Sequence, residues 1–187
     1  MSTLGFALLT LLARGPATGY ALRQQMRQPI GYFWTARHSQ IYRELALLAD
    51  GGHIVAREGQ GPGPRAKKTY TITETGRRAL AGWLSQLPDH QPRNELVLKA
   101  YGVNSGEPRA MAAMYQTAAD AAHEQAVIWQ AELESMAEQG YGDPGHPRFG
   151  NYAVLKMGVA AQRITHGWAA WLAGELRKMS ERESSGT

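Results

Sequence analysis

The chain of 187 residues contains no cysteine. Disulfides, thiolate metal sites and a cysteine nucleophile are therefore excluded, and a reducing compartment such as the cytoplasm is expected. Long hydrophobic runs are missing too. The apolar stretch at residues 4–12 has neither a basic leader nor a cleavage site, and it is far shorter than the roughly 20 residues of a membrane span. We expect a cytoplasmic protein with no membrane segment.

Motifs for catalysis and metal binding are also absent. The chain has six histidines, but His123-Glu124 is not followed by a second histidine at the helical spacing of a zinc motif. We interpret His166 as a core or interface histidine rather than a general base, because the sequence shows no positioned partner for it. The glycines at 59–63 lack the Lys-Ser ending of a phosphate loop. The sequence therefore predicts a protein that is not an enzyme and has no cofactor or metal.

Acidic residues are scarce in the first half of the chain. Residues 1–88 carry 11 Lys and Arg against four acids, a balance of +7, whereas the remainder carries nine against 12, a balance of −3. A basic half joined to a mildly acidic one indicates that only the first half faces a polyanion such as DNA.

The first half of the sequence predicts three short helices in tandem. Apolar residues at helical spacing place the first at about 4–14, where Gly15-Pro16 ends it. Thr18 can cap the second, which must end before Pro29 because the residue preceding a proline avoids helical dihedrals. The third ends at Gly51-Gly52. One face of this third helix carries Ile41, Leu45 and Leu48, and the opposite face carries Gln40, Arg43 and Glu44.

A hairpin and a fourth helix follow. Residues 54–58 and 68–72 have the pattern of strands, and the Gly/Pro-rich run between them can only be a loop. The tip of this hairpin is basic, with Arg65, Lys67 and Lys68. Thr73 can cap the fourth helix, in which Gly76 costs about 1 kcal/mol relative to alanine. Close packing against a neighbour is expected at Gly76.

Beyond Pro88 the pattern is entirely helical. A short helix near 93–101 and a turn at 102–107 precede a long helix at 108–139, and a break at 140–150 leads to a last helix at 152–179. The polar tail at 180–187 is predicted to be disordered. Each long helix carries an apolar stripe at steps of three and four, which requires a partner. The stripes are Met111, Tyr115, Ala118, Ala122, Ala126, Trp129, Leu133 and Met136 on the first, and Met157, Ala161, Ile164, Trp168, Leu172, Leu176 and Met179 on the second.

These elements predict a mainly α protein of two domains. Residues 1–88 form a winged helix-turn-helix with three helices, a two-stranded wing and a fourth helix, and residues 89–179 form a long-helix dimerisation domain. In that layout the third helix enters the major groove of DNA while the wing lies along the backbone. Taken alone, the third helix has a second interpretation as an ordinary solvated surface helix. A winged helix used only for protein contacts is another alternative, but it would need an apolar or acidic exposed face.

Three motifs in fixed order resemble those of the PadR transcriptional regulators, in particular the branch with a virulence-activator-like C-terminal part. They are Gly15-Pro16-Ala17-Thr18-Gly19-Tyr20, then Ser39-Gln40-Ile41-Tyr42-Arg43-Glu44-Leu45, then Tyr70-Thr71-Ile72-Thr73 with Gly76-Arg77-Arg78-Ala79-Leu80. The resemblance implies a DNA-binding repressor, occasionally an activator, which dimerises through its long C-terminal helices and often responds to a small aromatic effector. Two positions depart from the family pattern and put the local packing before the wing in question: His53 replaces an apolar residue and Ala49 an acid.

When the DNA-contacting positions of the family are transferred to this sequence one by one, the resemblance implies that one set of residues lies in the major groove of DNA. Arg43 is the strongest candidate for a base contact because its fork can grip guanine O6 and N7 together, and Gln40 can offer the matching pattern to adenine. Tyr42 has two interpretations, a groove contact or a core residue whose hydroxyl alone reaches a phosphate. Phosphate-positioning contacts are expected from the wing and from the first turn of the helix. The full DNA-binding set is Arg37, His38, Ser39, Gln40, Tyr42, Arg43, Arg65, Lys67 and Lys68.

Tryptophans in the long helices have two interpretations. Trp129, Trp168 and Trp171 could line a pocket for a flat aromatic effector, with Arg163 and His166 orienting a polar or anionic group. The alternative, which we favour, is that they form the core of a dimer. The predicted partners are therefore operator DNA, a second copy of the chain and an aromatic small molecule.

Overall fold

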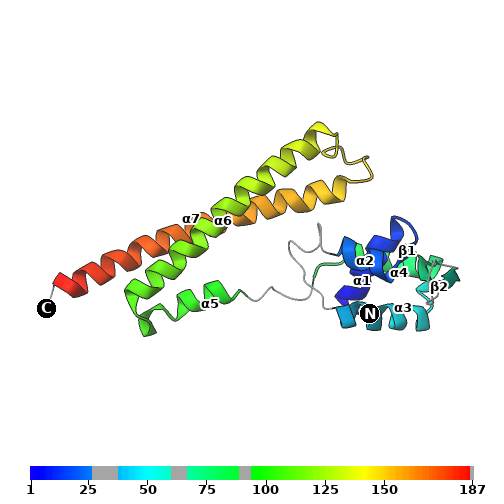
Figure 1. Ribbon diagram of the computed structural model, residues 1–187, viewed down its shortest axis with the longest axis horizontal. Helices are drawn as coiled ribbons and strands as arrows, with labels where there is room; N and C mark the ends of the chain where they lie inside the picture. The colour runs from blue at the N-terminus through cyan, green and yellow to red at the C-terminus, as the bar shows by residue number, and fades with distance from the viewer. Residues whose placement is uncertain (27–37, 60–66, 89–93, 186–187) are drawn as a thin grey trace. The chain divides into compact units, whose positions relative to one another are not determined.

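The computed structural model describes residues 1–26, 38–59, 67–88 and 94–185. The chain divides into two compact units, Met1–His90 and Gln91–Thr187, each described by itself below (Figure 1). Among the described helices, none is both long and apolar enough to cross a membrane.

Four helices of the first unit begin and end at the signals that the sequence carries. They are α1 (Thr3–Ala13), α2 (Gly19–Gln25), α3 (His38–Asp50) and α4 (Glu74–Leu84). The predicted caps of α2 and α4 are confirmed, because the hydroxyls of Thr18 and Thr73 accept hydrogen bonds from backbone N–H groups at 3.2 and 3.1 Å. Each cap satisfies an amide that the first turn of a helix leaves without an intrahelical partner.

A small antiparallel sheet lies beside these helices. Its strands are β1 (Ala17–Thr18), β2 (Ile54–Gly59) and β3 (Lys67–Ile72), in the spatial order β1-β3-β2. The β2–β3 pair is the predicted wing. The third strand, β1, was not predicted, because a two-residue strand is too short to show an alternating pattern. It pairs Ala17 with Tyr70 and Thr18 with Thr69.

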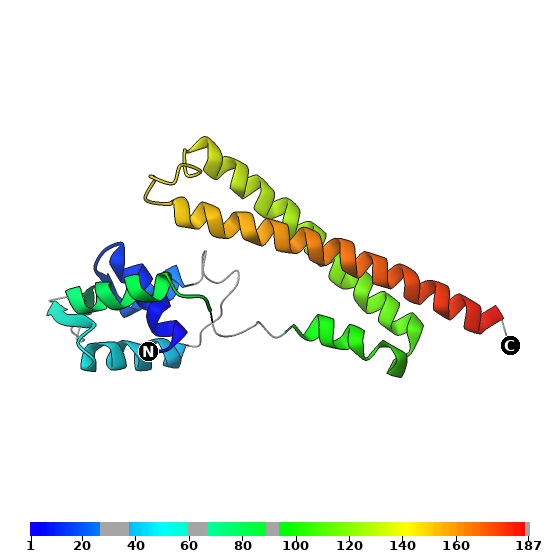
Figure 2. The same cartoon turned by 180° about the vertical axis from the view of Figure 1, so that it is seen from behind.

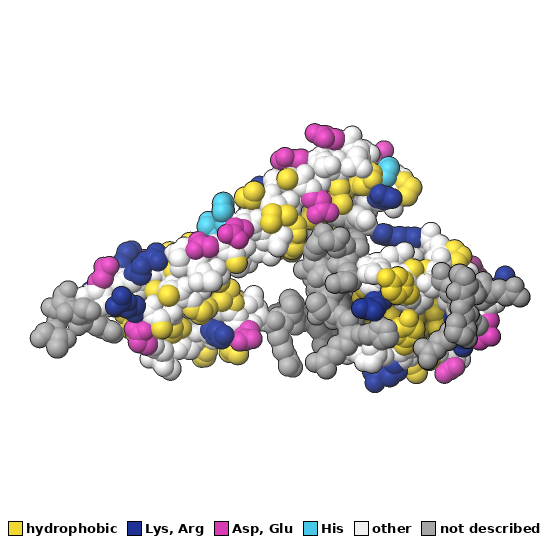
Figure 3. Space-filling model, viewed as in Figure 1, with side chains coloured by type: hydrophobic (Ala, Val, Ile, Leu, Met, Phe, Trp, Pro, Cys, Tyr) yellow, Lys and Arg dark blue, Asp and Glu magenta, His cyan; other side chains and the backbone are white. Residues whose placement is uncertain are grey.

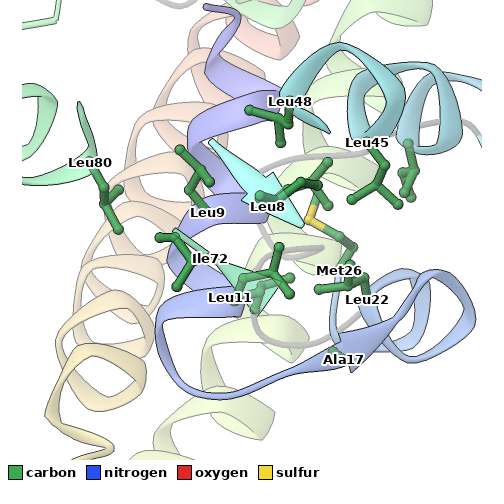
Figure 4. Close-up of a cluster of buried hydrophobic side chains, with 13 residues drawn as sticks. Leu8, Leu9, Leu11, Ala17, Leu22, Met26, Leu45, Leu48, Ile72 and Leu80 are labelled. Carbon is green, nitrogen blue, oxygen red and sulfur yellow. The ribbon is translucent and has the colours of Figure 1, made fainter. Parts of the chain in front are cut away.

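The core of the first unit forms where α1 packs against the other helices (Figure 4). Leu8 and Leu9 of α1 are fully buried between Leu45 and Leu48 of α3 on one side and Leu80 of α4 on the other. The apolar face predicted for the third helix is confirmed. At the edge of the core, the rings of Phe6 and Trp83 stack at 4.6 Å and join α1 to α4.

Gly76 packs closely, as predicted. A Cβ at this position would overlap the carbonyl oxygen of His53, which would force the backbone apart. The same carbonyl accepts a hydrogen bond from the N–H of Thr73 at 3.0 Å. His53 itself is half-buried, and its Nδ1 is buried with no hydrogen-bond partner in the described structure. The departure from the family pattern at His53 therefore changes a side-chain environment and leaves the fold intact.

The second unit consists of a short helix, a 3₁₀ turn and two long helices. They are α5 (Glu95–Tyr101), η2 (Val103–Ser105), α6 (Pro108–Glu138) and α7 (Phe149–Ser185). Two views show α6 and α7 running antiparallel and crossing each other (Figures 1 and 2). The carboxylate of Glu107 caps α6 by accepting hydrogen bonds from the N–H groups of Arg109 and Ala110.

The apolar stripe predicted for the first long helix is largely confirmed, and its partner is α7 of the same chain. Tyr115, Ala122 and Trp129 are buried. The stripe predicted for the last helix is divided between two faces of α7. Leu176 is buried, and Trp168 and Leu172 are partly buried against the core between α6 and α7. Met157, Ile164 and Met179 are exposed, and four residues outside the predicted stripe are buried, Leu155, Val159, Ala169 and Ala173. The sequence could not distinguish the faces because α7 is apolar on both of them.

Residues 180–185, which were assigned to the predicted tail, continue α7 as far as Ser185. Residues 186 and 187 lie outside the described residues. Residues 180–185 contain neither glycine nor proline, and Glu and Arg have good helix propensity. A long helix that already exists extends into such a segment at little cost, because the unfavourable nucleation step has been paid by the residues before it.

Candidate DNA-binding interface

Helix α3 presents one face to the core and the other to solvent. Ile41, Leu45 and Leu48 are almost fully buried, whereas Ser39 and Arg43 are exposed on the opposite side. At 100° per residue, Arg43 is offset from Ile41 by about 200°, so its guanidinium points away from the protein. Gln40 is exposed on the flank of this outer face. This outer face holds the residues that the sequence analysis assigned to base contacts.

Glu44 does not belong to the outer face, and this part of the prediction is wrong. Its side chain is 7% exposed and lies against Gly5 of α1, where a Cβ would be 2.6 Å from Oε1. Glu44 is one turn from both Ile41 and Leu48, so it lies at the edge of the buried face. The first turn of α1 carries partial positive charge from its N–H groups, which favours a carboxylate there.

The side chain of Tyr42 is partly packed and partly exposed. Its side chain is 40% exposed, and its ring lies over Gly19 at the start of α2, with a Cβ at Gly19 only 2.8 Å from Cε1. The hydroxyl oxygen lies over the same glycine, 3.0 Å from the position of such a Cβ. The ring therefore packs against the start of α2, and a contact of Tyr42 with DNA stays a prediction.

Lys68 is an exposed cation on β3 of the wing. Lys68 pairs with Glu58 across the two strands, with Nζ 3.5 Å from Oε1, and both side chains are exposed. Exposed pairs of this kind contribute little to stability, so Glu58 does not prevent Lys68 from meeting a phosphate. For His38 and Lys67 the described part is the backbone, at the start of α3 and of β3. Arg37 and Arg65 lie outside the described residues.

Strand β1 connects the wing to the helix-turn-helix. It immediately precedes α2, and its pairing with β3 places Thr18, the cap of α2, opposite Thr69. Backbone hydrogen bonds of the sheet thus join the wing to the residues that immediately precede α2. The sequence analysis missed this link.

The five residues proposed for an effector pocket do not come together. Trp129 is 8% exposed and lies against Gly158, where a Cβ would be 3.0 Å from its ring. Trp168 is ten residues further along α7, about 15 Å at 1.5 Å per residue, and its ring meets that of Tyr115 edge-on at 5.7 Å. The two indoles therefore occupy separate places along the α6–α7 pair.

Of the other three residues, Arg163 and His166 contact α6, whereas Trp171 does not. Arg163 donates a hydrogen bond to Oε1 of Gln130 at 3.1 Å, and Nδ1 of His166 lies 3.0 Å from the carbonyl oxygen of Ala119. Trp171 is 60% exposed. It is on the side of α7 that faces away from α6.

Helix α7 has a second apolar face, on the side away from α6. Met157, Ile164 and Trp171 are 68, 73 and 60% exposed, and they recur every seven residues. A seven-residue repeat of large apolar side chains is typical of a helix that packs against another helix. Within the described residues of the second unit that face is uncovered.

Tyr115 has a structural role beyond the apolar stripe to which the sequence assigned it. Its ring is fully buried between α6 and α7, and its hydroxyl donates a hydrogen bond to the carbonyl oxygen of Leu96 at 3.0 Å, which ties α5 to the long helices. Burial raises the pKa of Tyr115 above its ordinary value, and the charge of Lys99 lowers it in part.

A winged helix with an outward-facing recognition helix, followed by a long-helix unit, defines the class of winged helix-turn-helix transcriptional regulators. Models of two known families match the chain: the transcriptional regulator PadR-like family over residues 8–82, and the virulence activator alpha C-terminal region over residues 92–177. The chain belongs to the PadR-like family.

Individual relatives agree with this assignment. The negative transcriptional regulator PadR of Bacillus subtilis is 32% identical over 90% of this chain and 94% of its own length. A crystal structure of Bacillus subtilis PadR in complex with operator DNA has a TM-score of 0.84 at 28% identity and covers 94% of this chain and 98% of that one. A structure of the same protein with p-coumaric acid has a TM-score of 0.65 at 29% identity and covers 94% and 99%.

Proposed function

We propose that this chain is a repressor that binds a specific operator DNA as a homodimer and is released by a small aromatic effector. The observation that carries the DNA-binding part is the position of Arg43. It stands on the exposed side of a helix whose other side is buried in the core, so the helix can enter a major groove without disturbing its packing. The Bacillus subtilis relative has been crystallised in complex with operator DNA, which supports operator DNA as the partner of this chain.

Charge supports this proposal. The first 88 residues have a balance of +7, and the wing adds the exposed Lys68 beside the recognition helix in the same unit. Phosphate contacts of this kind give affinity that falls steeply with salt, with about 0.9 counterion released per neutralised phosphate. A protein that binds DNA works where the chromosome is, so the cytoplasm is the proposed location.

The uncovered face of α7 supports the homodimer. Met157, Ile164 and Trp171 form a seam that lacks a partner within the described residues of the second unit, while the opposite face of α7 is already used by α6. A second copy of α7 would cover the seam in a two-fold arrangement. Two recognition helices would then require a near-palindromic operator with half-sites about 34 Å apart, one turn of DNA, or a multiple of that distance.

The proposed effector is a small aromatic molecule. The p-coumaric acid complex of the Bacillus subtilis relative motivates an aromatic acid as the ligand class. In this chain Trp168 and Trp129 are separately packed, so a pocket that uses Trp171 would have to form beside the seam, with the second copy supplying the other wall. A tenfold loss of DNA affinity requires that the ligand prefer the non-binding state by about 1.4 kcal/mol.

One experiment tests the core of the proposal. Selection of bound sequences from a random duplex pool should yield a near-palindromic motif, and gel shifts on that motif should show binding far tighter than to a scrambled duplex. Phenolic acids are then titrated against the complex. Equal binding to all duplexes would refute sequence-specific recognition, and a complete lack of binding to DNA or heparin at low salt would favour the alternative, a winged-helix module for protein contacts.

A further inference from the structure

Two histidines that are far apart in the sequence lie side by side where α6 packs against α7. The ring centroids of His123, on α6, and His166, on α7, are 5.0 Å apart, and the ring planes are inclined by 43°. His123 is exposed and His166 is half-buried, so the pair is open to solvent. The space-filling view shows histidine side chains at the surface over α6 and α7 (Figure 3).

A hydrogen bond determines which nitrogen of His166 is available. Nδ1 lies 3.0 Å from the carbonyl oxygen of Ala119, and a carbonyl only accepts, so Nδ1 carries the hydrogen. The lone pair of the neutral ring is therefore on Nε2. Metal-binding histidines typically donate their other ring N–H to a carbonyl or carboxylate, because that bond fixes the tautomer and orients the ligating nitrogen.

The spacing of the two rings suits two ligands of one ion. With bonds of about 2 Å and tetrahedral angles, two imidazole nitrogens on one ion lie about 3.3 Å apart. The ring centroids are 5.0 Å apart, and His123 is exposed, so its side chain has room to rotate and bring one of its nitrogens closer to Nε2 of His166. His166 stays in place, held by Ala119.

We propose that His123 and His166 form a binding site for a divalent transition cation, Zn²⁺, Ni²⁺ or Cu²⁺, that joins α6 to α7. Imidazole nitrogen suits these ions, whereas Mg²⁺ and Ca²⁺ prefer oxygen ligands. Among the residues that the structure describes, no cluster of three or more His, Cys, Asp or Glu side chains could hold a metal ion. Water therefore completes the coordination of the pair.

Charged groups from both helices lie near the pair. One turn before His123, Asp120 accepts a hydrogen bond from Gln116 at 2.9 Å, and one turn before His166, Arg163 is held by Gln130. The carboxylate of Asp120 attracts a cation and the guanidinium of Arg163 repels one. With two protein ligands and these opposing charges, binding is weaker than at a structural zinc site with four ligands.

The test uses the untagged full chain. Thermal unfolding in ZnCl₂, NiCl₂ or CuCl₂ should show a higher midpoint than in MgCl₂, and EDTA should reverse the shift, because an ion that binds only the folded state stabilises it. In titration calorimetry, His123→Gln and His166→Gln should each weaken binding at least tenfold. His146→Gln is the matched control, because His146 stacks on Tyr141 in the loop between the two helices and should leave binding unchanged.

His123→Gln is the most informative variant, because the exposed side chain of His123 makes no contribution to the core. The variant should fold as the parent does, so a loss of metal binding can be assigned to the lost ligand. Electron paramagnetic resonance of the Cu²⁺ form should show two nitrogen ligands in the parent chain and one in this variant. The proposal is overturned if the parent chain binds none of the three ions at millimolar concentration. It is also overturned if His123→Gln binds them as tightly as the parent, or if His146→Gln alone abolishes binding.

Discussion

Tyr42 and Gly19 are in direct contact, with the ring of the tyrosine lying over the backbone of the glycine. A Cβ at position 19 would be 2.8 Å from Cε1 of Tyr42 and 3.0 Å from its hydroxyl oxygen. Gly19 begins α2 and Tyr42 lies in α3, so this contact sets how closely the two helices of the helix-turn-helix approach each other. The glycine is required here by space and not by its backbone angles.

Gly19→Ala should therefore destabilise the protein by about 1–3 kcal/mol, the usual cost of overpacking, and weaken DNA binding. Urea unfolding measures the first effect. In a Tyr42→Ala background the cost should fall, since the ring that causes the clash is gone. Gly82→Ala is the control: it is in α4 with nothing within 4 Å of its Cβ, and alanine there should stabilise by about 0.5–1 kcal/mol. Equal costs of Gly19→Ala in the two backgrounds would contradict the contact.

Arg43→Ala should flatten the preference for one base position by about 1–3 kcal/mol, because the bidentate contact with a base edge is lost. Lys68→Ala should instead weaken binding to all sequences alike and reduce the slope of log affinity against log salt by about one. Gel shifts on single-base variants of the selected operator distinguish the two. Lys178→Ala, which removes a cation from the second unit, is the control and should change neither. An Arg43→Ala protein with the parental base preference would contradict the assignment.

Ile164→Glu should convert the dimer into a monomer and reduce operator affinity. The side chain is 73% exposed in the single chain, so a charge costs nothing there unless a second copy covers it. Light scattering measures the mass, and circular dichroism checks that the helices persist. Thr117→Glu, at an exposed position of α6, is the control and should remain dimeric. If both variants stay dimeric, the seam of α7 is not the interface.

Tyr115→Phe should cost about 1 kcal/mol at neutral pH, because the hydrogen bond to the carbonyl of Leu96 is lost. It should also remove part of the loss of stability at high pH. The pKa of Tyr115 is raised by burial, so its contribution is complete below about pH 10, the ordinary tyrosine value, and is lost as the pH rises through the higher folded value. Unfolding midpoints between pH 9 and 12 test this. The exposed Tyr101→Phe should leave the profile unchanged.

Much of the first unit could be predicted from the sequence because its signals are local. Thr18 and Thr73 cap the helices that follow them, and Ile41, Leu45 and Leu48 repeat at the spacing of a single buried face. Glu44 was misplaced because it lies at the edge of that face, where angle alone does not decide burial. Its partner, Gly5, is distant in the sequence.

The second unit could be predicted less well, because α7 has apolar residues around most of its circumference. Leu155 and Val159 face α6, whereas Met157 and Ile164 face away, and both pairs fit helical spacing. Which of them packs within the chain depends on the crossing of α6 and α7, a tertiary property. The meeting of His123 with His166 depends on the same crossing, so neither residue carried a signal alone.

The pairing of β1 with β3 affects how this protein can be altered. Because Ala17 and Thr18 meet Tyr70 and Thr69 through main-chain hydrogen bonds, the base of the wing is anchored whatever side chains stand further out along it. The charge of the outer part of β2 and β3 can therefore be changed separately from α3, the helix proposed to contact the bases. An engineer who wishes to retune affinity while keeping the operator should begin at Glu58 and Lys68 and leave β1 untouched.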